Sequence, residues 1–483
     1  MKTVLGMVLA TSCALAALMA PGAGAQIGNE VAITFEADSG ETTQAFRGTI
    51  EVPENRNNPD SRMIELTYVR FAATGDHAGV PIVYLAGGPG GSGIRTAKWR
   101  RFPLFMAMRA YGDVIALDQR GTGQSGNGLS DCTSSLREPD DQVMRDGQII
   151  AHYRAAIREC ADQWAGADFD MLGYTTVQNV ADLEDVRTHF GADKITLWGI
   201  SYGSHMALAA LNQMPERLDK VVIASAEGLD QTIKQPRYDR ALMARWQAAI
   251  DAVPSLKAQF PDIVDLITRV HARLDAEPVT LEIAQEGAAT STMILQRRHL
   301  QDMMSYVIGS PEHFLLVLQL YQALDAREDQ AFSDTYGQFF EINEPLSFSP
   351  MSALMDMASG ISDASRESFE RDYPSSLVGP YLNIYAYSGF GVVKGLDLGD
   401  GFRQDPVSDI PVLLISGSLD GRTMLEEQRQ AVRGLSNLTH IVVEHGGHNV
   451  FMLSPEITTR IEAFMAGEPV SEDPIVVALP GLE

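Results

Sequence analysis

The sequence predicts an α/β fold with a mostly parallel sheet, interrupted by one long helical insertion. Short, unbroken aliphatic runs alternate with helical patterns in the first half of the chain and again after residue 405. Strands that read as continuous apolar runs are typical of parallel sheets, because helices cover both of their faces. Residues 231–405 read instead as mostly helical segments, so we expect them to form an inserted cap.

The strands are expected where aliphatic runs are bounded by turn residues, at 31–37, 46–52, 62–72, 81–86, 113–118, 194–198, 221–224, 411–416 and 438–443. A Thr-Thr-Val-Gln segment at 175–178 resembles a capping box and predicts the start of an amphipathic helix. A second helix is expected over 202–213. The expected cap helices include 236–252, 260–274 and 312–324. The methionines of the cap are interpreted as helix-packing core, with an adaptable apolar wall over a substrate cleft as the alternative.

The domain organisation follows from these patterns and from the N-terminus. Lys2 precedes an almost wholly apolar run over 4–20, and small residues before Gln26 offer a cleavage site. This is the layout of a secretory signal peptide, and it predicts a periplasmic or extracellular protein. The alternatives are a membrane anchor, for which the run is short, and a lipoprotein attached at Cys13. We expect a signal peptide at 1–25, an α/β core at 26–230 and 406–483, and the cap at 231–405.

Charge and cysteine content exclude several classes of protein. The 483 residues include 37 basic and 63 acidic side chains, a net charge of -26, which opposes binding to nucleic acid or to anionic membranes. The three cysteines lack metal-ligand spacing, and we expect no metal or cofactor. After signal removal Cys132 and Cys160 remain, and in an oxidising compartment they are expected to form a disulfide. The alternative is two separate thiols, because Cys160 lies on a helical apolar stripe.

Residues 199–203 read Gly-Ile-Ser-Tyr-Gly, between an expected strand and an expected helix. This context is the one that a nucleophile elbow requires. The turn is too tight for a Cβ atom on either side, and Ser201 must stand at its tip with the hydroxyl exposed. Ordinary turn glycines are the alternative interpretation. The pattern predicts Ser201 as a catalytic nucleophile.

A serine nucleophile needs a base, and the base needs an acid that orients it. Asp420 follows the expected strand 411–416, and His448 follows the expected strand 438–443. This order after the nucleophile is the one that α/β hydrolases use. His445 competes as the base but lies only one or two residues past its strand, and Asp420 could be an ordinary turn residue. We predict Ser201, Asp420 and His448 as a catalytic triad.

A glycine cluster at 87–91, Gly-Gly-Pro-Gly-Gly, follows the expected strand 81–86. Acyl transfer develops an oxyanion that backbone amides stabilise. We predict the amides of Gly88 and Tyr202 as these donors. A phosphate-binding loop is rejected, because no Gly-Lys-Ser/Thr follows the cluster.

Five motifs in order resemble the proline iminopeptidase and tripeptidyl aminopeptidase group of serine peptidases: Ala86–Gly90, Asp118–Ser125, Gly199–Gly203, Asp409–Asp420 and Gly446–His448. The resemblance implies an α/β-hydrolase core with an inserted helical cap. It also implies release of a residue or short peptide from a free N-terminus through an acyl-enzyme. The exported, cysteine-paired, large-cap layout is more similar to the tripeptidyl branch.

An aminopeptidase must bind a protonated α-amine, so carboxylates are expected in its cleft. Glu227, at the entrance to the cap, is the expected anchor, although exposed acids are abundant in this chain. The first hypothesis is therefore an exported serine aminopeptidase acting on peptides. The alternatives are an esterase, amidase or lactonase that acts on small acyl substrates with the same triad, and a non-catalytic binding protein. The residues released per cut, the side-chain preference and the oligomeric state stay open.

Overall fold

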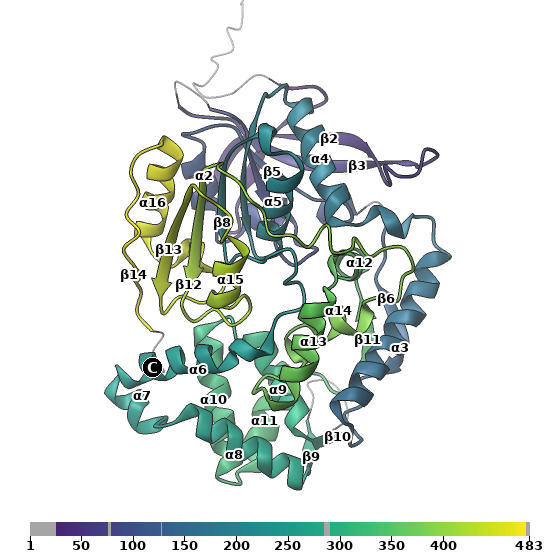
Figure 1. The fold of residues 1–483 in the computed structure, drawn as a ribbon, viewed down its shortest axis with the longest axis vertical. Helices are drawn as coiled ribbons and strands as arrows, with labels where there is room; N and C mark the ends of the chain where they lie inside the picture. The colour runs from purple at the N-terminus through teal and green to yellow at the C-terminus, as the bar shows by residue number, and fades with distance from the viewer. Residues whose placement is uncertain (1–25, 76–78, 127, 285–289, 480–483) are drawn as a thin grey trace, which may run out of the picture.

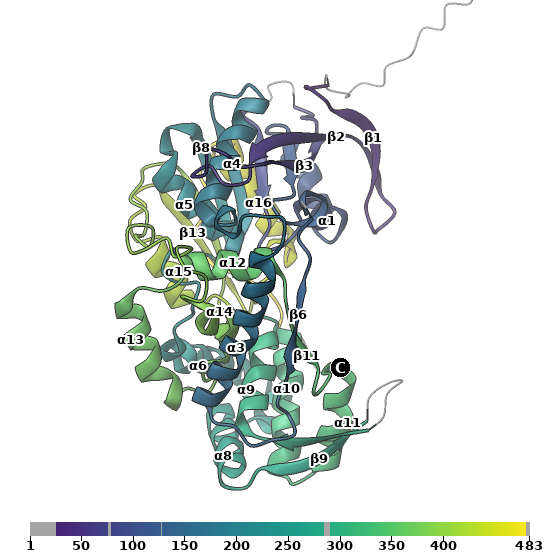
Figure 2. The same ribbon diagram turned by 90° about the vertical axis from the view of Figure 1, so that its right-hand side faces the viewer.

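The computed structural model describes residues 26–75, 79–126, 128–284 and 290–479. The expected signal peptide at 1–25 lies outside the described residues. Figure 1 shows a sheet flanked by helices in one half of the molecule and a mainly helical assembly in the other. Figure 2 shows helices α12, α13 and α14 in the region between these two halves.

Ten strands of the described residues form the central sheet. In spatial order they are β1 (Val31–Glu36), β2 (Thr42–Pro53), β3 (Met63–Phe71), β5 (Val114–Leu117), β4 (Ile82–Leu85), β7 (Ile195–Ile200), β8 (Leu218–Ala224), β12 (Val412–Gly417), β13 (Leu438–Glu444) and β14 (Ile475–Val476). The pairings from β1 to β5 are antiparallel, and all pairings from β5 to β14 are parallel. The expected α/β fold with a mostly parallel sheet is confirmed.

Both faces of the sheet are covered, which explains why its strands read as unbroken apolar runs. Alternate side chains point to opposite faces: Val83 and Leu85 of β4 pack in one apolar cluster, and Tyr84 packs in another. The helices of the first face are α3 (Asp146–Ala165), α4 (Thr176–His189), α5 (Tyr202–Gln213) and α15 (Leu425–Ala431). Those of the second are α1 (Gly93–Lys98), α2 (Phe102–Met108) and α16 (Pro455–Ala466).

The strands expected from the sequence are all present, and α5 has the expected bounds. Helix α4 begins after Thr175, whose hydroxyl accepts a hydrogen bond from the Gln178 amide at 3.3 Å. Only this half of the expected capping box forms. The Gln178 side-chain oxygen instead accepts from the Arg56 amide, because the neighbouring strand connection packs against this helix terminus.

The insertion contains more strand than the sequence predicted. Its elements are α6 (Asp239–Asp251), α7 (Pro254–Gln259), α8 (Ile263–Ala276), β9 (Val279–Ile283), β10 (Ser291–Leu295), α9 (Arg297–Val307), α10 (Pro311–Asp325), α11 (Asp329–Phe339), β11 (Pro345–Phe348), α12 (Pro350–Ser359), α13 (Asp363–Asp372) and α14 (Ile384–Gly389). Strands β9 and β10 form a hairpin, and β11 pairs with β6 (Cys132–Arg137) from the first part of the chain. Strand β11 was missed because its pairing partner lies more than 200 residues earlier in the chain.

Two parts of the insertion pack differently. Helices α6 and α8 to α11 share an apolar cluster of their own, whereas α12 and α14 pack into the cluster beneath α4 and α5. The methionines are buried in these two clusters, as expected for helix packing: Met293, Met303, Met304, Met351, Met355 and Met357. Helix α12 is thereby held directly against the α/β core, while the outer helices form a separate layer.

The expected disulfide is present: Cys132 of β6 is bonded to Cys160 of α3, with 5.6 Å between their Cα atoms. It ties the strand that reaches the insertion to the long helix beside it.

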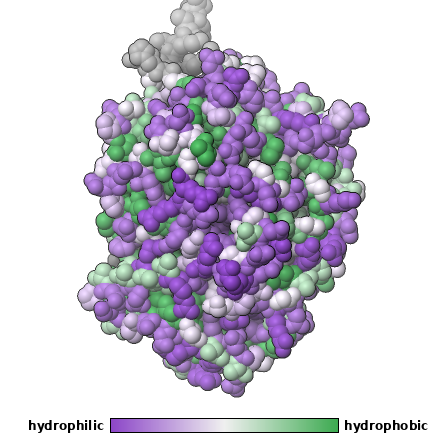
Figure 3. Space-filling view, in the orientation of Figure 1, coloured by the Kyte–Doolittle hydropathy of each residue, from purple (hydrophilic) through white to green (hydrophobic). Residues whose placement is uncertain are grey.

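No helix among the described residues is long and apolar enough to cross a membrane. The face shown in Figure 3 is predominantly hydrophilic, with apolar residues scattered over it.

Candidate active site

Ser201 lies in a strained turn between β7 and α5, with φ 55° and ψ -127°. Neighbouring backbone explains the glycines on both sides. A Cβ on Gly203 would clash with the carbonyl oxygen of Leu85, and one on Gly199 would lie 2.7 Å from the carbonyl oxygen of Gly203. The tight packing of strand, turn and helix therefore fixes the backbone at Ser201 in a conformation that non-glycine residues rarely adopt.

Asp420 and His448 lie in the loops that follow β12 and β13. Nδ1 of His448 is 3.0 Å from Oδ2 of Asp420. Because a carboxylate only accepts hydrogen bonds, this nitrogen is the donor, so in a neutral ring Nε2 carries the lone pair that a base needs. Asp420 is fully buried, which by itself raises its pKa, but His448 and the Thr423 amide and hydroxyl lower the pKa below its usual value.

The last residue of β8, Ala224, and the residue after it, Ser225, connect Ser201 to the histidine loop. The Ser201 amide donates to the carbonyl oxygen of Ala224 at 3.1 Å, and the Ser225 hydroxyl donates to the carbonyl oxygen of His448 at 2.7 Å. Strands β7, β8, β12 and β13 are consecutive neighbours in the sheet and run parallel. Ser201, Asp420 and His448 therefore lie at the same carboxyl edge of the sheet.

The competing histidine is oriented differently. Nδ1 of His445 lies 2.9 Å from the carbonyl oxygen of Val477, on the chain that follows β14. The His445 ring is thus hydrogen-bonded at the outer edge of the sheet, whereas the His448 ring contacts Asp420. The geometry favours His448 as the base.

The glycine loop after β4 passes over Ser201. A Cβ on Gly87 would lie 3.0 Å from the Cβ of Ser201, so this close approach requires a glycine. Gly88 adopts φ 128°, which is also open to glycine but not to residues with a side chain. Tyr202 is the first residue of α5, where backbone amides have no partner within the helix. Gly88 and Tyr202 therefore come from the two segments that flank Ser201.

A cavity of about 270 Å³ opens beside the catalytic loops. Its lining includes Arg422, whose amide donates to Oδ1 of Asp420 at 2.8 Å. A Cβ on Gly309 would lie 3.0 Å from that of His448 and 3.2 Å from that of Arg422, so these two side chains adjoin. The other lining residues come from α9, α12 and the segment 381–386: Asp302, Ser305, Tyr306, Asp356, Tyr381, Leu382, Asn383, Ile384, Tyr385 and Ala386.

Asp302 and Asp356 give this cavity its electrostatic character. Burial, reinforced by the negative charge of Glu138, raises the pKa of Asp302 to about 8. Burial, reinforced by Glu227, raises the pKa of Asp356 to about 8 as well. Both groups are therefore mainly neutral acids at pH 7 in the unliganded protein, and a cation that enters the cavity favours their ionised forms.

The sequence did not single out either of these aspartates. Each lies inside a helical stretch that is otherwise rich in apolar residues and methionine. An acid in such a stretch is a signal for a buried carboxyl group, but nothing in the sequence shows that the two helices face one cavity.

Glu227 requires a correction. Its carboxylate lies 2.8 Å from Nζ of Lys234, and both side chains are buried, at 6% and 4% exposure. Lys234 also donates to the carbonyl oxygen of Gln231 at 2.8 Å. Glu227 is absent from the cavity lining, and its charge is already balanced by Lys234. It is a member of a buried ion pair at the entrance to the insertion rather than a carboxylate available to substrate.

Among the residues that the structure describes, no three or more His, Cys, Asp or Glu side chains are grouped so that they could hold a metal ion.

The chain has the α/β-hydrolase fold, and its residues 80–300 match the family described as alpha/beta hydrolase fold. The serine protease Hip1 of Mycobacterium tuberculosis is 30% identical over 206 residues, which cover 40% of this chain and 39% of that protein. The tripeptidyl aminopeptidase of Streptomyces lividans is 27% identical over 256 residues, or 48% and 46% of the two chains.

A proline iminopeptidase of Xanthomonas citri is 25% identical over 287 residues, which cover 57% of this chain and 71% of that protein. The resemblance to the proline iminopeptidase and tripeptidyl aminopeptidase group is confirmed by these relatives. The matches span less than half the length of Hip1 and of the Streptomyces enzyme.

Proposed function

We propose that this protein is an exported serine aminopeptidase that releases N-terminal residues or short peptides through an acyl-enzyme. The observation that carries the proposal is the position of Ser201 and of the Asp420–His448 pair at one sheet edge, beside a cavity with two carboxyl groups. The names of the relatives support the same class of activity.

The chemistry follows from the assigned roles. His448 removes the proton from the Ser201 hydroxyl as its oxygen attacks the scissile carbonyl carbon, and Asp420 stabilises the imidazolium that forms. The carbonyl oxygen becomes an oxyanion that accepts hydrogen bonds from the amides of Gly88 and Tyr202. The C–N bond then breaks as His448 returns its proton to the leaving amine. Water, activated by the same histidine, releases the acyl group and regenerates Ser201.

The cavity provides a means of selecting a free N-terminus. A protonated α-amine that enters between Asp302 and Asp356 favours their ionised forms, and each carboxylate can accept a charge-assisted hydrogen bond from it. We therefore assign the binding of the substrate α-amine to Asp302 and Asp356 instead of Glu227. A neutral acyl substrate would gain nothing from ionised carboxyl groups here, which favours the aminopeptidase over an esterase, amidase or lactonase.

Two assays test the proposal. A fluorophosphonate should label the folded protein at Ser201, and Ser201→Ala should abolish the adduct; absence of labelling would exclude a serine hydrolase. Aminoacyl-, dipeptidyl- and tripeptidyl-anilides should then be compared with simple p-nitrophenyl esters. Turnover of esters alone would establish the alternative function instead.

Export is part of the proposal and rests on the N-terminal sequence, with the Cys132–Cys160 disulfide as support for an oxidising compartment. Expression of the full chain in a bacterial host, followed by N-terminal sequencing of the extracytoplasmic product, should give Gln26 as the first residue. Recovery of the uncleaved chain in the cytoplasm would contradict export.

A further inference from the structure

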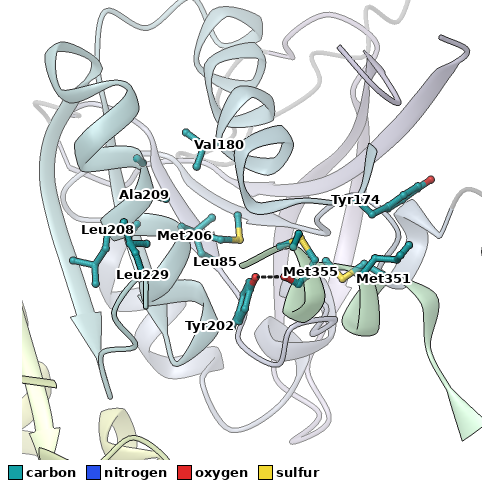
Figure 4. Close-up of a cluster of buried hydrophobic side chains, with 14 of the residues drawn as sticks. Leu85, Tyr174, Val180, Tyr202, Met206, Leu208, Ala209, Leu229, Met351 and Met355 are labelled. Atoms are coloured by element: carbon teal, nitrogen blue, oxygen red, sulfur yellow. Dashed lines mark hydrogen bonds between the residues drawn. The ribbon is translucent and has the colours of Figure 1, made fainter. Parts of the chain in front are cut away.

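Helix α12 contacts both segments that flank the nucleophile. It belongs to the insertion in sequence but packs into the apolar cluster of the α/β core. Figure 4 shows Met355 of this helix beside Tyr202, with a hydrogen bond drawn from the tyrosine to this residue, and Met351 farther along toward Tyr174. That bond runs from the Tyr202 hydroxyl to the carbonyl oxygen of Met355, at 3.2 Å.

The first turn of α12 holds the glycine loop. The Ser352 hydroxyl donates to the carbonyl oxygen of Pro89 at 2.7 Å, and Pro89 directly follows Gly88. A Cβ on Gly90 would clash with the Ser352 hydroxyl, so helix and loop are in direct contact. A loop of this composition has few local restraints, because glycine permits many backbone conformations. The Ser352 bond supplies one such restraint from outside the loop.

The last residue of α12 holds the other segment. Ser359 Oγ lies 2.9 Å from the Tyr202 hydroxyl and 3.1 Å from Nε2 of His205, and all three side chains are buried. The Tyr202 hydroxyl also lies 2.9 Å from Oγ1 of Thr176, on α4. These contacts fix the Tyr202 side chain, and with it the backbone that carries the Tyr202 amide. Such external restraints are what a strained turn like that at Ser201 needs to persist.

The spacing of the two serines places both contacts on one face of the helix. Seven residues of an α-helix complete about two turns, so Ser352 and Ser359 project in nearly the same direction, about 10 Å apart along the axis. We propose that α12 is a positioning helix for the oxyanion hole, with Ser352 restraining the Gly88 segment and Ser359 restraining the Tyr202 segment. This inference rests on the proposed function, because it assigns the two amides to the same oxyanion.

The kinetic test uses Ser352→Ala and Ser359→Ala, with Ser349→Ala as the matched control. Ser349 is exposed at the start of the same helix, and its side chain makes no capping hydrogen bond. Loss of one oxyanion donor lowers kcat about 100- to 1000-fold, so a loosened donor should lower it about tenfold. We expect this fall in kcat with KM within twofold, and a parallel fall in the rate of fluorophosphonate labelling. Ser352→Thr, which keeps the hydroxyl, should restore most of the rate.

A second readout does not depend on turnover. Hydrogen exchange followed by mass spectrometry should show faster exchange in peptides covering 87–91 for Ser352→Ala, and in peptides covering 201–205 for Ser359→Ala. Ser349→Ala should change neither. Thermal melts identify any variant that has lost its fold. If one serine variant is unfolded, the hydrogen exchange of the other serine variant tests the positioning role.

The outcomes separate the inference from the proposed function. If the wild type turns over anilides and both serine variants keep wild-type kcat and exchange, the positioning role is wrong and the aminopeptidase stands. If the wild type neither binds fluorophosphonate nor cleaves anilides or esters, the proposed function fails and the positioning role fails with it.

Discussion

Replacement of Asp356 by asparagine tests how the cavity recognises a free amine. The change removes one ionisable group and keeps the shape of the side chain. Asp334→Asn is the matched control, because Asp334 is an exposed aspartate of the same insertion and lies outside the cavity lining. We expect Asp356→Asn to lower kcat/KM for substrates with a free N-terminus and to spare substrates in which that amine is acetylated.

The expected size of the effect follows from the pKa of about 8. At pH 7 about one tenth of such carboxyl groups are ionised, and at pH 8 about half of them are. A hydrogen bond between a carboxylate and an ammonium contributes about 1.5–3 kcal/mol. A large part of this contribution therefore offsets the cost of ionisation at pH 7, whereas at pH 8 most of it is left as net binding. Because the ionised fraction rises about fivefold, the loss caused by Asp356→Asn should grow by up to about fivefold between these two pH values.

The assay measures kcat/KM for a free-amine anilide and for an N-acetylated p-nitrophenyl ester at pH 6, 7, 8 and 9. Dividing the first by the second removes the contribution of Ser201 and His448, and comparing variant with wild type removes the titration of the substrate amine. A loss that is equal for both substrates, or that does not change between pH 7 and pH 8, would refute the assignment of Asp356 to the amine.

Three further predictions concern stability. Glu227→Gln should lower the free energy of unfolding by about 3–5 kcal/mol, because it leaves Lys234 buried without its charged partner. The ratio of kcat/KM for free-amine substrates to kcat/KM for N-blocked substrates should stay the same. A change in this ratio would restore Glu227 as the amine anchor. The pKa of Asp302 is raised to about 8 in the folded protein, so its contribution to stability falls as pH rises from about 4 to 8. The melting temperature of Asp302→Asn relative to the wild type should therefore be about 4 °C higher at pH 8.5 than at pH 5, as scanning calorimetry can measure. Replacing both Cys132 and Cys160 by serine should lower the free energy of unfolding, measured in urea, by about 3–4 kcal/mol without changing kcat. An unchanged midpoint of the urea unfolding curve would contradict a stabilising disulfide.

Local pattern was enough to predict the elements around the nucleophile. The glycine at 199 is required by backbone atoms of Gly203, a few residues away, so this requirement is visible in the sequence, whereas Gly203 is required by the adjoining strand at Leu85. Asp420 and His448 were located by the same reasoning, because the carboxyl ends of neighbouring parallel strands meet at one edge of the sheet. Strand order and loop position therefore carried much of the information about this part of the site.

The insertion was predictable only as a set of helices. Strand β11 forms by pairing with β6, more than 200 residues earlier, and neither segment has a strong strand pattern of its own. The split of the insertion into an outer layer and the core-bound α12 and α14 depends on which apolar face meets which neighbour. A helical period shows that a face is apolar but not what covers it.

The sequence by itself determined the parallel sheet, the nucleophile turn and the order of the residues that follow it, because each depends on short-range patterns and on the fixed geometry of strands. Only the tertiary structure decided which acids line the cavity. Glu227, Asp302 and Asp356 are equivalent in a list of 63 acidic residues, yet Glu227 is paired with Lys234 while the other two line one cavity. The physical reason is that burial and charge pairing are properties of neighbours brought together from distant parts of the chain, and these set both the pKa of a carboxyl group and its access to a ligand.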